Sequence, residues 1–206
     1  MSWIRTVPFG EAAGKLRAIY NRVKGPDDNV DNILMAHSLR PHTLEGHMTL
    51  YKYVLHHSAN KLPKWLLETI GTYVSLLNDC AYCVEHHFAG LRRLLADDTK
   101  SFAIRRAMEQ GDLAPTISDG HLSPRDVAAL DYAALLTRTP SAVSENHIEA
   151  LRAAGFDDGE ILEINQVTAY FAYANRTVLG LGVTTDGDAL GLSPGDNDDP
   201  DNWGHN

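Results

Sequence analysis

Apolar residues recur three and four positions apart along most of this 206-residue chain, which is the spacing of one face of an α-helix. Few stretches show the period of two that a half-buried strand would need. Apolar side chains make up 44% of the residues, so the chain can build a full core and is not disordered as a whole. The sequence therefore predicts an all-α fold.

Prolines, glycines and capping residues divide this pattern into separate helices. Asn78 or Asp79 is expected to cap a helix that begins at Cys80, and Asp157 or Asp158 to cap the last one. The expected helices span residues 11–23, 29–39, 42–57, 64–76, 80–95, 101–110, 124–136, 144–154 and 158–179, with a polar linker at 111–120.

Residues 1–183 are expected to form a single helical domain. An equal spacing allows it to consist of two related halves, because Glu68 stands twelve positions before Cys80 and Glu163 stands twelve before Asn175. The halves would lie at about residues 30–110 and 120–183.

Residues 184–206 form an irregular acidic tail that contains six aspartates and no lysine or arginine. The net charge of the chain is -9, and the rest of it is nearly balanced, with 21 acidic against 18 basic side chains. The tail aspartates are most simply a solvated segment, and Leu190, Leu192 and Trp203 could pin the tail to a surface. An acidic chain without a basic patch argues against nucleic acid and anionic membranes as partners.

No apolar run reaches the roughly 20 residues that a membrane-spanning helix needs. The first ten residues also lack the apolar stretch of a signal peptide. These features predict a cytoplasmic protein.

The two cysteines of the chain belong to the pattern Glu68-x11-Cys80-x2-Cys83-x3-His87. On a helix, the two cysteines and His87 would share one face. The partial positive charge of a helix N-terminus stabilises a thiolate, and a nearby histidine can accept the proton. The pattern therefore favours a reactive dithiol over a pair of buried structural cysteines.

Glu68 can join this group only if the chain turns back. Twelve residues of straight helix span about 18 Å, which is too far for a hydrogen bond. A break at Asn78 and Asp79 would permit two antiparallel helices. A buried Glu68 could then orient His87 and keep its imidazole basic.

Three functions are compatible with these residues. A thiolate that attacks a peroxide becomes a sulfenic acid, and the second thiol condenses with it to form a disulfide. The same dithiol could instead exchange disulfides with a partner protein, as an oxidoreductase or redox sensor. Cys80, Cys83, His87 and Glu68 or His86 could also stabilise a helical oligomer through zinc, although the second distant cysteine pair of structural zinc sites is absent, and we expect no metal.

The segment resembles the alkylhydroperoxidase D-like (AhpD-like) group of the carboxymuconolactone decarboxylase superfamily, in particular its peroxidase-related branch. The shared features are the Glu68, Cys80, Cys83 and His87 spacing, the sequence pattern Asn78-x-Cys80-x-Tyr82-Cys83, and the pair His86-His87. Further similarity extends over most of residues 32–183, in Leu39-Arg40-Pro41, LDYAALLTRTP, LRAAGFDDGEI and Ala174-Asn175-Arg176 followed by LGLGV.

The resemblance implies an all-α, homo-oligomeric antioxidant peroxidase that reduces hydrogen peroxide or organic hydroperoxides. It makes Cys83 the peroxide-attacking thiol and Cys80 its resolving partner, with Glu68 and His87 in a proton relay. Members with established peroxidase activity often have a histidine where this chain has Tyr82. A phenol with a pKa of about 10 cannot replace that base, but it could donate a hydrogen bond to a peroxide oxygen.

The remaining histidines give no metal pattern. His37, His42 and His47 are five residues apart, which rotates each by about 140° around a helix, so we expect them, with His56 and His57, to be exposed. His86 is expected at the surface or an interface. No dinucleotide fingerprint is present, so no bound cofactor is expected, and electrons must come from an external dithiol protein or small thiol.

Overall fold

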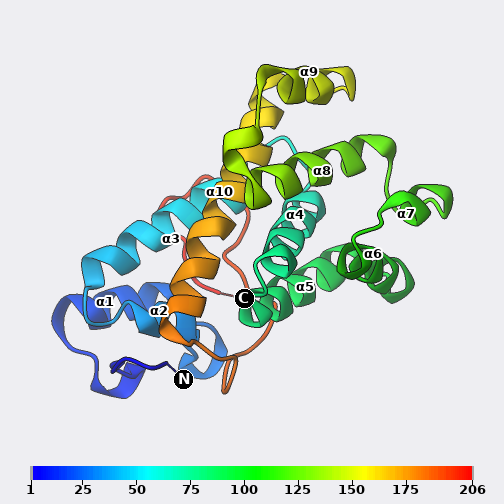
Figure 1. The fold of residues 1–206 in the computed structure, drawn as a ribbon. Coiled ribbons are helices and arrows are strands. Elements are labelled where there is room, and N and C mark those ends of the chain that lie inside the picture. The colour runs from blue at the N-terminus through cyan, green and yellow to red at the C-terminus, as the bar shows by residue number, and fades with distance from the viewer. Residues whose placement is uncertain (1, 206) are drawn as a thin grey trace.

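The computed structural model describes residues 2–205. Within that range the chain forms ten α-helices and no β-strand, and 66% of it is helical, so the predicted all-α fold is confirmed (Figure 1). The helices are α1 (Gly14–Val23), α2 (Asn32–Ala36), α3 (Pro41–Leu55), α4 (Lys64–Leu77), α5 (Ala81–Leu95), α6 (Asp98–Gln110), α7 (Ala114–Ser118), α8 (Pro124–Arg138), α9 (Glu145–Ala153) and α10 (Asp158–Leu181).

The long helix α10 lies in the middle of the molecule, between α3 and α4 (Figure 1). Helices α5 and α8 also contact it. Its buried face includes Ile164, Val167 and Phe171, and α4 is buried continuously from Leu66 to Ser75. The pair of α4 and α10 is therefore the core against which the other helices pack.

The chain turns back between α4 and α5, as the position of Glu68 requires. Helix α4 ends at Leu77, and Asp79 takes the left-handed conformation with φ of 55°, which stops the helix. The expected caps are wrong, because neither Asn78 nor Asp79 but Cys80 is the N-cap residue of α5.

Two expected segments differ from the structure. The helix expected at 29–39 is only the short α2, because Asp31 has extended backbone angles and α2 begins after it. The linker expected at 111–120 contains α7, whose first turn holds Pro115, a position that tolerates proline because its N–H would be unpaired there.

Capping explains why two other helices begin where the sequence predicts. The Ser123 side chain accepts from the Asp126 backbone N–H, and the Asp126 side chain accepts from the Ser123 N–H. Asp157 and Glu160 form the same reciprocal pair at the start of α10.

The equal spacings that allowed two related halves correspond to different local structures. Glu68 and Cys80 lie on opposite sides of the turn between α4 and α5, whereas Glu163 and Asn175 lie in one continuous helix, α10. The spacing therefore does not reflect a common arrangement of the two segments.

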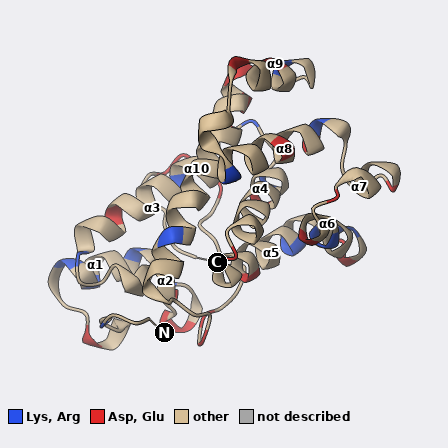
Figure 2. Cartoon of the chain, viewed as in Figure 1, with Lys and Arg blue, Asp and Glu red and all other residues tan. Residues whose placement is uncertain are grey.

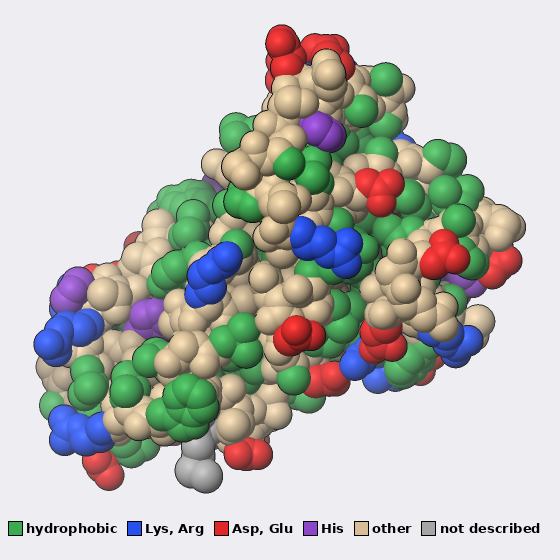
Figure 3. Space-filling view, in the orientation of Figure 1, with side chains coloured by type: hydrophobic (Ala, Val, Ile, Leu, Met, Phe, Trp, Pro, Cys, Tyr) green, Lys and Arg blue, Asp and Glu red, His purple; other side chains and the backbone are tan. Residues whose placement is uncertain are grey.

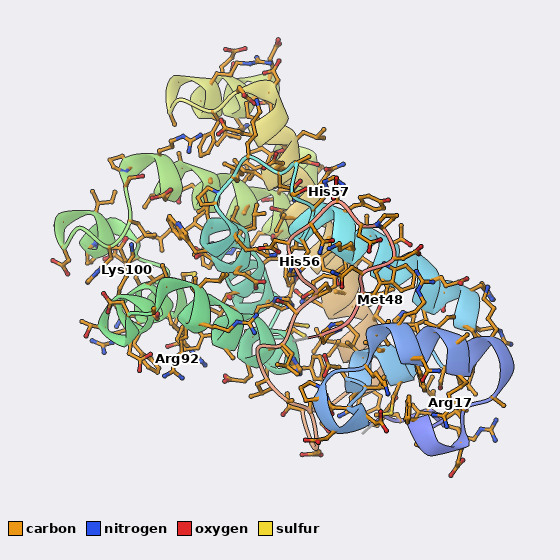
Figure 4. The ribbon with its side chains drawn as sticks, turned by 180° about the vertical axis from the view of Figure 1, so that it is seen from behind. Arg17, Met48, His56, His57, Arg92 and Lys100 are labelled. Carbon is orange, nitrogen blue, oxygen red and sulfur yellow. The ribbon has the colours of Figure 1, made fainter. Side chains whose placement is uncertain are left out.

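The tail is irregular, and it packs on the helices. It crosses the side of the molecule shown in Figure 4, and His56 lies beside it near the middle of that view. Trp203 is buried, as expected of an anchor, whereas Leu190 is exposed. The buried Lys52 ammonium donates hydrogen bonds to the Gly195 carbonyl and the Asn197 side chain. The tail therefore stays close to α3.

Charged and apolar side chains are mixed over the surface. Figure 2 shows acidic and basic residues scattered over the helices, and Figure 3 shows apolar side chains interspersed with charged ones on one face. Among the helices formed by residues 2–205, none has both the length and the apolar character needed to cross a membrane.

The close crossing of α4 and α10 depends on Gly71. A Cβ atom at this position would lie 2.2 Å from the ring of Phe171. We predict that Gly71→Ala lowers the free energy of unfolding by about 1–3 kcal/mol through overpacking, measured by denaturant titration.

Gly46 provides the matched control, because it lies inside α3 and is exposed, and a Cβ there would meet nothing within 4 Å. Gly46→Ala is expected to raise stability by about 0.5–1 kcal/mol, since alanine is the better helix former. Equal effects of the two substitutions would contradict the close crossing.

Candidate active site

The turn between α4 and α5 brings Glu68 and His87 together. The Nδ1 atom of His87 lies 2.8 Å from Oε2 of Glu68, and both side chains are largely buried. Burial alone would raise the pKa of Glu68, but the interaction and hydrogen bond with His87, together with the nearby Lys64 ammonium, outweigh it and lower that pKa. Glu68 is therefore a carboxylate that accepts from Nδ1–H, which leaves Nε2 of a neutral His87 ring free to accept a proton.

The two cysteines lie at the first turn of α5, reduced and buried. A hydrogen bond between the thiols lowers the pKa of Cys80, whereas burial raises the pKa of Cys83 well above its usual range. The thiolate that a helix N-terminus was expected to favour is therefore that of Cys80, and the Cys83 thiol holds its proton until a base removes it.

A cavity of about 50 Å³ lies beside the second cysteine. Its wall includes Cys83, Glu68 and His87, whereas Cys80 is not among the described residues that line it. The aromatic side chains of Tyr51 and Tyr170 close another part of the wall. Cys83 is thus the sulfur that a small molecule in this cavity would meet first.

Asp188 of the tail belongs to the same region, and sequence reasoning missed it. Its Oδ2 atom accepts a hydrogen bond from the Tyr82 hydroxyl at 2.7 Å and lies 3.1 Å from Nε2 of His86. The backbone N–H of Asn32 also donates to it, and the Asp188 side chain is only 2% exposed. The interpretation of the tail aspartates as a solvated segment is therefore wrong for Asp188. Nothing in the composition distinguishes it from the other five.

This arrangement changes the expected roles of the two supporting residues. The Tyr82 hydroxyl gives its hydrogen to Asp188 and accepts from the backbone N–H of Ile33 at 3.2 Å, so it is not free to donate to a peroxide. His86 was expected at the surface or an interface, but its side chain is largely buried and lines the cavity.

The expectation of exposed histidines is wrong for three of the five. His37, His47 and His56 are buried, whereas His42 is exposed and His57 half-buried. Burial lowers the pKa of His47 to about 3 and that of His56 well below its usual value, so both are neutral. His47 lies on the inner face of α3 and lines the cavity.

No group of three or more His, Cys, Asp or Glu side chains within residues 2–205 is arranged to hold a metal ion.

Asn175 holds α10 to α4 through two hydrogen bonds. Its side-chain amide donates to the Ser75 hydroxyl at 3.0 Å and accepts from the Asn78 amide at 3.0 Å. These two hydrogen bonds fix the C-terminal end of α4, directly before the segment that contains Cys80 and Cys83.

No protein family model and no curated protein sequence matches this chain. Solved structures do. An uncharacterized peroxidase-related protein from Silicibacter sp. TM1040 is 27% identical, with a TM-score of 0.67 over 77% of this chain and 78% of that one. A second such protein, from Ralstonia eutropha JMP134 and described as an alkylhydroperoxidase AhpD core, is 23% identical, with a TM-score of 0.73 over 91% and 93% of the two chains.

The chain therefore has the all-α AhpD-like fold of the peroxidase-related proteins, as the sequence resemblance predicts. The same fold occurs in the debrominase Bmp8, whose structure with 2,3,4-tribromopyrrole is 16% identical with a TM-score of 0.64 over 84% of each chain. The fold by itself therefore does not fix the reaction.

The opposite pKa directions of the two thiols give a testable result. We predict that the reduced protein forms one thiolate, on Cys80, at lower pH than an ordinary cysteine, and the second only at much higher pH. The ultraviolet absorbance of the thiolate measures both steps during a pH titration.

Substitutions of Cys83 test whether its hydrogen bond is the cause of the lowered pKa of Cys80. Cys83→Ala removes the donor and should raise the pKa of Cys80, whereas Cys83→Ser keeps a hydroxyl donor and should keep that pKa low. The hydrogen bond is not the cause if Cys80 titrates alike in both variants.

Proposed function

We propose that this protein is a thiol-dependent peroxidase that reduces hydrogen peroxide or organic hydroperoxides. The observation that carries the proposal is the position of Cys83, which faces a small cavity whose wall also contains the Glu68–His87 pair. A nucleophile, a base and a group that orients the base are the parts that such a reaction needs.

The reaction begins with removal of the Cys83 proton by Nε2 of His87, whose ring Glu68 orients through Nδ1. The thiolate attacks one peroxide oxygen, the O–O bond breaks, and the leaving oxygen takes the proton from His87 to become water or an alcohol. Cys83 is then a sulfenic acid, oxidised by two electrons.

Cys80 completes the cycle by attacking the Cys83 sulfur. Its lowered pKa makes it the better nucleophile of the pair at neutral pH, and condensation releases water and forms the Cys80–Cys83 disulfide. A small thiol, or a dithiol protein once the chain has moved to expose the disulfide, then returns two electrons by thiol–disulfide exchange. No bound cofactor takes part in this scheme.

Burial of the sulfurs favours this function over direct disulfide exchange with a partner protein. Both cysteines are at most 3% exposed, so a partner protein's disulfide cannot reach them without movement of the chain, whereas a small peroxide can fit the cavity. Direct exchange with a protein, as in a redox sensor, is therefore the second candidate. Assembly into a homo-oligomer and a cytoplasmic location remain predictions.

Peroxide consumption by the reduced protein tests the proposal. Wild type should consume hydrogen peroxide with an added thiol reductant, whereas Cys83→Ser should lose at least about 99% of the rate, as is usual when a nucleophile is removed. Cys80→Ser should still react once and stop at a sulfenic acid on Cys83, which mass spectrometry after dimedone labelling detects.

Equal rates in wild type and both variants would exclude the dithiol cycle. If sulfenic acid instead forms on Cys80 in the Cys83→Ser variant at the wild-type rate, the roles of the two cysteines are reversed.

A further inference from the structure

The tail forms one wall of the cavity that Cys83 faces. Gly191, Leu192, Ser193 and His205 all line it, and all four belong to the irregular tail that follows α10. The opening of the cavity therefore depends on where the tail lies.

Contacts on both sides of this wall hold the tail in place. Before it, Asp188 binds Tyr82, His86 and the backbone of Asn32. Beyond Ser193, Trp203 is buried under the guanidinium of Arg22, and Nδ1 of His205 lies 2.9 Å from the Val23 carbonyl. The segment between Asp188 and Trp203 is thus fixed at both ends, like a strap.

Gly191 is the point at which this strap sits closest to α5. It has φ of +80°, and a Cβ atom there would lie 2.9 Å from Cβ of Ala89 and 3.1 Å from the backbone nitrogen of Gly90. Gly90 in turn lies against Glu68, since its own Cβ would be 3.6 Å from the carboxyl carbon. The absence of a side chain at Gly191 lets the tail close directly beside the Glu68–His87 pair.

The cavity beneath the tail is small. A water molecule needs at least about 10–15 Å³ of such space. The cavity of about 50 Å³ can therefore hold hydrogen peroxide or a molecule that is larger by only a few atoms. An aromatic or long-chain hydroperoxide could not enter whole. Buried His47 also lines the cavity, and its Nδ1 atom has no hydrogen-bond partner within residues 2–205.

We propose that the tail determines substrate size: seated through Gly191, it restricts the dithiol site to hydrogen peroxide and short-chain hydroperoxides. This inference rests on the proposed peroxidase function for the identity of the substrates, but access to Cys83 can be measured without it.

Two glycine substitutions form a matched pair for the test. Gly191→Ala adds a methyl group that must push the tail away from Ala89 and Gly90. Gly187→Ala places the same methyl group at φ of +86°, where nothing lies within 4 Å. Both substitutions carry the energetic cost of an alanine in the left-handed conformation. Only Gly191→Ala adds a collision with α5.

Each variant is measured in two ways. The first is the rate of thiol oxidation by cumene hydroperoxide relative to hydrogen peroxide. The second is the rate of Cys83 alkylation by a bulky maleimide relative to iodoacetamide, followed by mass spectrometry. Gly191→Ala should raise both ratios by about tenfold, the order of effect expected of overpacking, and Gly187→Ala should leave both near wild type.

The two measurements separate the two proposals. A raised alkylation ratio in Gly191→Ala with no peroxide oxidation in any variant supports the strap and refutes the peroxidase. Unchanged ratios in Gly191→Ala, or equal increases in both variants, would overturn the role of the tail whether or not the protein reduces peroxides.

Discussion

The hydrogen bond between Glu68 and His87 is the interaction on which the rest of the site depends. A buried carboxylate is costly unless it is paired, so the structure must bring an imidazole to it. Two features support this contact. The left-handed conformation of Asp79 turns α5 back along α4. Gly71 lets α10 approach α4 closely, so that Phe171 packs edge-on against His87, with ring centroids 4.5 Å apart. The pair in turn fixes which nitrogen of His87 can act as a base.

The site also divides the chemistry between its two sulfurs. Cys80 has the lower pKa but does not line the cavity, whereas Cys83 lines it and keeps its proton because it is buried. In the proposed cycle, the attacking thiol Cys83 therefore needs the base that Glu68 orients, and the resolving thiol Cys80 is already prepared for the second step. The neutral His47 adds no positive charge to the cavity wall, which suits the uncharged substrate of the proposed reaction.

The sequence predicted the parts that depend on local spacing. Helical periodicity identified the fold class, and the turn at Asn78 and Asp79 placed Glu68 near His87, because both follow from residues close along the chain. It could not predict which histidines are buried. His47 and His42 both belong to α3, and only the position of the other helices decides that His47 lies on the covered face and His42 on the exposed one. It also could not single out Asp188 among six tail aspartates, because its contacts come from residues more than 100 positions away.

The most direct test of the central claim is the rate at which hydrogen peroxide converts Cys83 to sulfenic acid in a Cys80→Ser background, with and without Glu68→Gln. Glutamine keeps the shape of Glu68 but not its charge, and circular dichroism can verify that the helices persist. If the buried carboxylate makes His87 an effective base, Glu68→Gln slows the oxidation by about a hundredfold near neutral pH, within the range expected for loss of general base catalysis. Equal rates in the two proteins would contradict the claim that this pair activates Cys83.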